Sequence, residues 1–169
     1  MKLRVLIVAL FVWGCGGNAP VEDETPVETQ TAALEEEQQV NTEPERDPLE
    51  APADVAAIPE DATVTASGLG YKVLQEPNPE GRQASQLAKV KVHYTGWTTD
   101  GERFDSSVER GEPLDIELTK VIEGWKEGVG EMKEGEKRRF WIPENLAYKG
   151  AEGFPAGMLV FEVELIQVY

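Results

Sequence analysis

Aromatic side chains are the residues of this sequence best placed to form a reaction site. Several fall where a predicted strand meets a turn, and Phe140 is expected to be a core residue. A concave group of aromatic rings suits a reaction that needs no nucleophile, metal or cofactor, and rotation about an X–Pro amide is such a reaction. The candidates are Tyr94, Trp97, Phe104, Trp125, Phe140, Trp141, Tyr148, Phe154 and Phe161.

The remaining residues argue against most other kinds of catalysis. Residues 62–169 contain no cysteine, which excludes Cys–His catalysis, and their single histidine, His93, is expected to be structural because no nucleophile-elbow sequence accompanies it. The acidic residues lack calcium-loop spacing and no glycine-rich phosphate loop occurs, so neither a metal nor a cofactor is expected. Spacing leaves a two-carboxylate glycosidase open, although one short domain leaves little room for a deep sugar cleft.

Alternating apolar and polar residues predict the strands that would carry these side chains. In residues 89–95, Val90, Val92 and Tyr94 share one face, while lysines and His93 share the other, as in a strand with one buried face. Asp100-Gly101 follows as a strong hairpin-turn signal. Further strands are predicted over residues 102–104, 114–118, 138–142 and 159–165, with a weaker candidate over residues 70–75.

One helix is predicted between residues 121 and 132. Gly124, Gly128 and Gly130 give this stretch poor intrinsic helix propensity, so packing in the concave side of the sheet must hold it. Its apolar face consists of Val121, Ile122, Trp125, Val129 and Met132. Residues 62–169 are therefore predicted to form an α+β domain, a curved antiparallel sheet wrapped around one short α-helix.

Residues 1–17 have the pattern of a secretory signal peptide. Lys2 and Arg4 precede an apolar run that is too short for a transmembrane helix, and small residues follow it. Gly14-Cys15-Gly16-Gly17 resembles the lipobox of bacterial lipoproteins, which implies cleavage before Cys15 and lipidation of that cysteine. A plain signal peptide with an incidental cysteine is the alternative.

Residues 18–61 are predicted to be a disordered, acidic, proline-rich tether. They carry one arginine against fourteen acidic residues and contain no aromatic residue, so they cannot bury enough apolar surface to offset the entropy of ordering. The net charge of the whole chain is −16, and a nucleic-acid partner is not expected because phosphate binding requires a basic surface.

Residues 92–165 as a group resemble the FKBP-type peptidyl-prolyl cis/trans isomerases. The order and spacing of the motifs over this range make the resemblance specific, whereas any single motif would be weak. The motifs are Val92-His93-Tyr94-Thr95-Gly96, Asp100-Gly101, Phe104-Asp105-Ser106-Ser107, Arg110-Gly111-Glu112-Pro113-Leu114, Val121-Ile122-Glu123-Gly124-Trp125, Met132-Lys133-Glu134-Gly135-Glu136, Ile142-Pro143, Leu146-Ala147-Tyr148 and Leu159 to Leu165.

The resemblance implies a pocket between helix and sheet. Trp125 would form its floor, and Tyr94, Phe104, Val121, Ile122 and Phe161 would form its walls. Leu114 stands where many family members have an aromatic residue, and Phe154 lies in a loop that contacts substrate in relatives. Asp105 and Tyr148 would be the polar groups near the substrate amide, with Tyr148 donating to a carbonyl. An Asx-type cap is the alternative for Asp105, and a structural role is the alternative for Trp125.

Two rival functions remain open beside the isomerase. One is a non-catalytic binding module of the same fold for unfolded clients or a macrolide-like ligand. The other is an anchored chaperone, in which Trp97 and Trp141 would form an exposed apolar patch. The expected partners are proline-containing unfolded or partly folded proteins and, through Cys15, a membrane. The signal peptide implies the periplasmic face of a bacterial cell envelope, with Gly16 favouring the outer membrane, and a monomer is expected.

Overall fold

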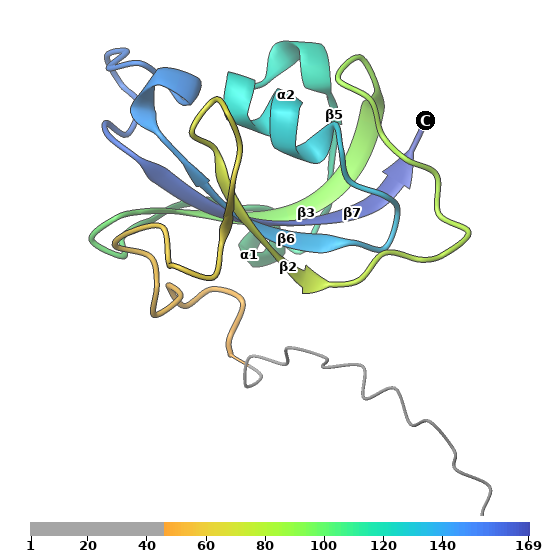
Figure 1. The fold of residues 1–169 in the computed structure, drawn as a ribbon, viewed down its shortest axis with the longest axis horizontal. Helices are drawn as coiled ribbons and strands as arrows, with labels where there is room; N and C mark the ends of the chain where they lie inside the picture. Colours follow the sequence, from red (N-terminus) through yellow and green to blue (C-terminus); the bar gives the residue numbers. More distant parts are fainter. Residues whose placement is uncertain (1–45) are drawn as a thin grey trace, which may run out of the picture. The chain divides into compact units, whose positions relative to one another are not determined.

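The computed structural model describes residues 46–169, in which an antiparallel sheet curves around helix α2 (Glu123–Val129) (Figure 1). The sheet order is β1-β2-β6-β7-β3-β4, and β5 pairs with β3 beside that path. This arrangement confirms the predicted fold class. The strands are β1 (Thr63–Val64), β2 (Gly70–Gln75), β3 (Lys89–Thr98), β4 (Arg103–Ser106), β5 (Leu114–Glu117), β6 (Lys137–Ile142) and β7 (Leu159–Val168).

The two ten-residue strands β3 and β7 form the centre of the sheet. They pair antiparallel, with Val92 opposite Leu165 and Tyr94 opposite Val163, and β7 pairs on its other edge with β6. The predicted alternation holds, because Val90, Val92 and Tyr94 are buried on the side that faces α2. The weaker prediction over residues 70–75 is also confirmed, since β2 spans Gly70–Gln75 and pairs with β6.

Helix α2 is shorter than the periodicity predicts and begins at Glu123. Its glycines permit close packing rather than flexibility. A Cβ atom on Gly124 would collide with the Ile142 side chain, and one on Gly128 would collide with the Phe140 ring. The helix thus lies directly against β6, and packing holds it as predicted.

Three short helical segments were not predicted: α1 (Ser107–Arg110) and the 3-10 turns η1 (Leu118–Lys120) and η2 (Glu144–Leu146). In α1 the Ser106 side chain is the N-cap and accepts a hydrogen bond from the Glu109 N–H. The alternative in which Asp105 caps this segment is therefore wrong. Asp105 is left free to point elsewhere.

Residues 46–61, which we call the strap, pack against the outer face of the sheet, away from α2 (Figure 1). The predicted domain boundary at residue 62 is thus placed too late, because residues 46–61, which were assigned to the tether, pack against the sheet. Trp97 and Trp141 are fully buried on this outer face, so the exposed patch predicted for them is wrong. The strap has little apolar surface of its own, and the outer face of the sheet provides the apolar side chains, Trp97 and Trp141, against which it packs.

The predicted signal peptide, Cys15 and the tether up to residue 45 lie outside the described residues. Within residues 46–169, no helix has the length and apolar character needed to cross a membrane.

Candidate active site

A cavity of about 440 Å³ opens between α2 and the concave face of the sheet. Its lining includes all but one of the residues predicted from the sequence as catalytic or substrate-binding. Phe104 is the exception, because it packs edge-on behind Phe161 with 5.4 Å between ring centroids. The predicted residues that line the cavity are Tyr94, Asp105, Leu114, Val121, Ile122, Trp125, Tyr148, Phe154 and Phe161.

Three aromatic rings form the floor and inner wall of this cavity. The indole of Trp125 meets the Tyr94 ring at 5.1 Å and 85°, and the Phe161 ring at 5.4 Å and 83°. Edge-to-face contacts of this kind add to the energy of burial and fix the ring orientations. All three side chains are at least nine-tenths buried, so the cavity has a rigid apolar base.

Gly96 of β3 allows the rings of Phe104 and Phe161 to cross the strand. A Cβ atom at this position would lie closer to both rings than any real contact permits. In the local sequence Tyr94-Thr95-Gly96, Tyr94 therefore places its own ring in the cavity. Gly96, two residues later, leaves room for the rings of Phe104 and Phe161. This is a steric reason for glycine in the middle of a strand.

A polar network borders the apolar base on the β4 side. The Tyr94 hydroxyl donates to Asp105 Oδ2 at 2.5 Å, and Arg110 Nη2 donates to the same hydroxyl oxygen at 2.9 Å. Arg110 also forms an ion pair with the other oxygen of Asp105. Burial raises the pKa of the Tyr94 hydroxyl and the bond to Asp105 adds to the rise, so this group stays protonated near neutral pH.

Arg110 is a member of the site that sequence reasoning did not single out. In the sequence, Arg110 occurs only as the first residue of the motif Arg110-Gly111-Glu112-Pro113-Leu114, and no role was assigned to it. Its hydrogen bond to Asp105, and then the one to Tyr94, raise the pKa of its guanidinium further above an already high value. It is therefore a fixed positive charge that orients the carboxylate.

Tyr148 and Phe154 form the outer rim of the cavity. Their rings stack at 4.5 Å with 21° between planes, and Phe154 remains 55% exposed. Burial raises the pKa of Tyr148, and the nearby charge of Asp105 adds to this effect. Its hydroxyl makes no hydrogen bond to any other residue in the range 46–169, so a protonated donor is available at the cavity edge.

The comparisons with known proteins agree with this geometry. The family model for FKBP-type peptidyl-prolyl cis-trans isomerases matches residues 80–166. The chain belongs to this family. An FK506-binding protein of Neisseria meningitidis serogroup C is 50% identical over 95 residues, which cover 53% of this chain and 87% of that protein.

Other FKBP relatives are longer than the matched region. The FKBP-type isomerase FkpA of Aeromonas hydrophila is 50% identical over 107 residues, 62% of this chain but only 39% of the relative. The crystal structure of FkpA from Escherichia coli has a TM-score of 0.60 at 39% identity and covers 65% of this chain and 52% of that one. An isomerase structure from Pseudomonas syringae has a TM-score of 0.58 at 33% identity, covering 65% and 82%.

Two further residues of the FKBP cavity were also missed, Ile116 of β5 and Lys120 of η1. Ile116 was assigned only to a strand face. Lys120 follows the alternating strand β5 in a segment with no motif, and it pairs with Glu117 at 3.0 Å. Alternation along residues 114–118 places Ile116 on the same strand face as Leu114, and this could have marked it as a cavity residue. No pattern in the sequence indicates Lys120.

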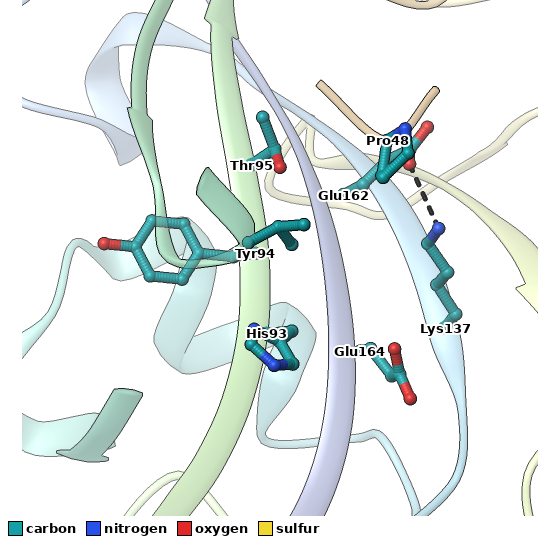
Figure 2. A pocket seen from close by; sticks show the side chains of 8 residues that line it. Pro48, His93, Tyr94, Thr95, Lys137, Glu162 and Glu164 are labelled. Atoms are coloured by element: carbon teal, nitrogen blue, oxygen red, sulfur yellow. Dashed lines mark ion pairs between the residues drawn. The ribbon is translucent and has the colours of Figure 1, made fainter. Parts of the chain in front are cut away.

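A second hollow, of about 290 Å³, lies on the outer face of the sheet (Figure 2). It is bordered by charged and polar groups, including His93, Lys137, Glu162 and Glu164, and by Pro48 of the strap. Figure 2 shows the Tyr94 ring on the other side of β3, pointing away from this hollow. His93 Nδ1 lies 3.0 Å from Ser107 Oγ, in keeping with its predicted structural role. Charged groups of this kind do not suit a prolyl ring.

Among residues 46–169, no group of three histidine, cysteine or acidic side chains is placed to hold a metal ion.

Proposed function

We propose that this protein accelerates X–Pro bond rotation in unfolded and partly folded proteins of a bacterial cell envelope. The observation that carries the proposal is the closed set of aromatic rings around Trp125, bordered by the network of Tyr94, Asp105 and Arg110. Membership of the FKBP family supports the reaction class. The substrates, the cellular location and the residue roles are the proposed part.

The apolar base would act on the electronic state of the amide. The barrier to rotation is about 18–20 kcal/mol, because the twisted amide loses its resonance. Trp125, Phe161 and the Tyr94 ring would strip water from the prolyl carbonyl, which disfavours the planar, charge-separated form. A rigid cavity that fits the twisted amide better than the planar one lowers the barrier by differential binding.

The polar groups would fix the substrate backbone. The Tyr148 hydroxyl is a protonated donor with no partner in the described part of the chain, and we assign it a hydrogen bond to a substrate carbonyl. Both carboxylate oxygens of Asp105 are engaged, one by the Tyr94 hydroxyl and the other by Arg110. We therefore assign Asp105 the role of polarising and orienting its neighbours, and not that of a base. Leu114, Val121, Ile122 and Phe154 would contact the residues around proline.

A ligand of the macrolide class is also expected to bind in this cavity. The Neisseria relative is named as an FK506-binding protein, and the same aromatic base would accept the ring of such a ligand. Trp97 and Trp141 are buried and do not form the exposed apolar patch on which a separate chaperone function was based. A non-catalytic binding module remains the competing function, and kinetics distinguish it.

We further propose lipid anchoring through Cys15 and a location on the periplasmic face of the envelope. The support is the positive start of the chain, the short apolar run and the cysteine that follows it. Residues beyond the anchor would hold the isomerase, as a monomer, away from the membrane.

The deciding experiment uses the full chain, purified in mild detergent, in a protease-free fluorescence assay on short X–Pro peptides. Acceleration that a macrolide inhibitor abolishes is the expected result. A folded chain that shows no acceleration, with any of several residues before proline, would contradict the enzymatic proposal and leave the binding module. Labelling with a radioactive fatty acid in cells tests the anchor separately, with Cys15→Ser as the control.

A further inference from the structure

The strap crosses the strands of the sheet on the face opposite the cavity. Near its start, Arg103 Nη1 of β4 donates to the Leu49 carbonyl at 3.1 Å. Near its end, the Lys72 ammonium of β2 pairs with Asp61 at 2.6 Å. Three turns, closed by backbone bonds within residues 47–50, 52–55 and 59–62, shape the path between these points. One short segment thereby contacts strands near both edges of the sheet, β4 at one edge and β2 toward the other.

A buried ionic cluster of Arg139, Asp54 and Glu162, which we call the latch, holds the middle of the strap. Arg139 of β6 is fully buried and donates to both carboxylate oxygens of Asp54, at 2.7 and 2.8 Å, and to Glu162 of β7 at 2.7 Å. The Trp141 indole N–H donates to the Asp54 carbonyl at 3.0 Å. A buried guanidinium without these partners would be very costly, so the latch fixes the strap strongly.

The first part of the strap lies directly behind one wall of the cavity. The pairing of β3 with β4 shifts between Gly96 and Trp97, and Trp97 then pairs with Arg103. On the outer face, the Arg46 guanidinium lies 5.7 Å from the centroid of the Trp97 ring, and Arg103 is bonded to Leu49. The strap therefore holds both outward side chains of this irregular pair.

The inward side chains of the same irregularity either line the cavity or support a residue that lines it. Phe104 follows Arg103 in β4 and packs against Phe161, and Asp105 pairs with Gly96 and binds the Tyr94 hydroxyl. Irregular pairing leaves a strand less constrained by its neighbour than regular pairing does. The position of Phe104 and Asp105 therefore depends on what holds β4 from behind.

We propose that the strap is a positioning element of the active site. Residues 46–51 hold the outer side of the β3–β4 irregularity and so fix Phe104 and Asp105, while the pair of Asp54 with Arg139 keeps the strap in place. Arg46, Asp54 and Arg103 are positioning residues, since none of them touches the cavity. This inference rests on the proposed isomerase function of that cavity.

The two ends of the strap give a matched test. Arg103→Ala removes the bond to Leu49 and an ion pair with Glu109, whereas Glu109→Gln removes only the ion pair. Asp54→Asn weakens the latch, whereas Asp61→Asn removes a pair at the β2 end, far from the cavity wall in the sheet order. All four variants are made in the full chain, and kcat/KM is measured per folded molecule.

Arg103→Ala and Asp54→Asn are expected to lower kcat/KM about fivefold to tenfold, because small displacements of positioned groups are costly. Glu109→Gln and Asp61→Asn should stay within about twofold of the parent, as expected for exposed pairs. Equal kcat/KM in all folded variants, whatever their melting temperatures, would overturn the proposal. An inactive parent chain would instead contradict the isomerase function itself.

Addition of the strap as a separate molecule sharpens the result. Residues 46–61 are replaced in the full chain by a glycine–serine segment of equal length, and a synthetic peptide of residues 46–62 is titrated in. Saturable recovery of kcat/KM is expected, and a peptide with Asp54→Asn should recover less. A folded replacement chain that is fully active without peptide would overturn the proposal. If that chain does not fold, the point variants decide alone.

Discussion

On the concave face of the sheet, Tyr94, Trp125 and Phe161 surround a cavity that stays open to solvent, whereas on the outer face Arg139 and Glu162 are buried beneath the strap. The same strands supply both faces. In β3, the Tyr94 side chain lines the cavity, whereas its neighbour Thr95 borders the hollow on the outer face, from which the Tyr94 ring points away (Figure 2). Alternation along one strand therefore separates the face that carries the candidate site from the face that the strap covers in part.

The difference lies in what fills the space beside each face. The concave face keeps unfilled volume for a ligand, so its rings must be held by one another and by α2. Beneath the strap the outer face is covered by the chain itself, so the charged side chains buried there need partners. Lys137, Arg139 and Arg46 all pair with Glu162 and together keep its pKa below its usual value, although burial acts in the opposite direction.

The strongest test of the concave face is Trp125→Ala. We expect a loss of about 3–5 kcal/mol in the free energy of unfolding, which is usual for truncation of a buried indole. Turnover should fall close to the uncatalysed rate even where the chain is folded, because the floor of the cavity is gone. Urea unfolding and peptide kinetics are measured on the same samples. Normal kinetics in the folded fraction would make Trp125 purely structural, and Trp125→Phe serves as the control that keeps a ring.

The corresponding test of the outer face is Glu162→Ala. It leaves the buried Arg139 with Asp54 as its main partner, and we expect a loss of about 3 kcal/mol in the free energy of unfolding, as for other broken buried pairs. Glu164→Ala is the control, since that side chain is more exposed on the same strand. A loss below about 1 kcal/mol in urea unfolding, as for a surface pair, would show that the outer network contributes little.

Asp105→Leu tests the polar border between the two faces. The carboxylate is partly exposed, so the fold should survive, but Tyr94 and Arg110 lose their shared partner. We expect kcat/KM to fall about tenfold, or about 1.4 kcal/mol in transition-state binding. Asp105→Asn keeps an acceptor for Tyr94 and should fall less. Unchanged turnover in Asp105→Leu would remove this residue from the mechanism.

Tyr148→Phe should have a smaller effect. It removes one hydroxyl that has no partner within the described chain, and one hydrogen bond contributes about 0.5–1.5 kcal/mol. The ring and its stacking on Phe154 remain, so we expect kcat/KM to fall about twofold to tenfold with an unchanged melting temperature. Initial rates on one X–Pro peptide at several concentrations suffice to measure this. A rate equal to that of the parent would mean that no substrate carbonyl accepts from Tyr148.

Sequence patterns predicted the concave face far better than the outer one. Alternation in residues 89–95 and 159–165 marks the buried side directly, and the motif order places Trp125, Tyr148 and Phe161 around one pocket. The outer face could not be predicted in this way. Trp97 and Trp141 alternate with core residues, as exposed side chains would, and nothing near them in sequence shows that residues 46–61 cover them.

The strap itself was missed because composition describes a segment in isolation. Residues 46–61 are acidic, rich in proline and poor in large apolar side chains, which is typical of disorder. Their order comes from partners more than 80 residues away, such as Arg139 and Trp141. Arg110 was missed for a related reason, since only the folded turn brings it to the Tyr94 hydroxyl.

The smallest expected effect is that of pH on kcat/KM. The pH dependence of catalysis reports on the concave face, and the pH dependence of stability reports on the outer face. Tyr94 and Tyr148 both have a pKa raised by burial above the ordinary value of about 10, so both hydroxyls remain protonated donors at neutral and mildly alkaline pH. We therefore expect kcat/KM to stay flat between about pH 6 and 9.

Stability, in contrast, should fall on the acid side. Glu162 has a pKa lowered in the folded state, so its contribution is present above its unfolded pKa of about 4.5 and is lost as pH falls through the folded value. Urea unfolding from pH 7 down to pH 3 should show this loss, and Glu162→Gln should flatten the profile. A decline of kcat/KM between pH 7 and 9 would instead indicate that a group with a much lower pKa than either tyrosine controls the cavity.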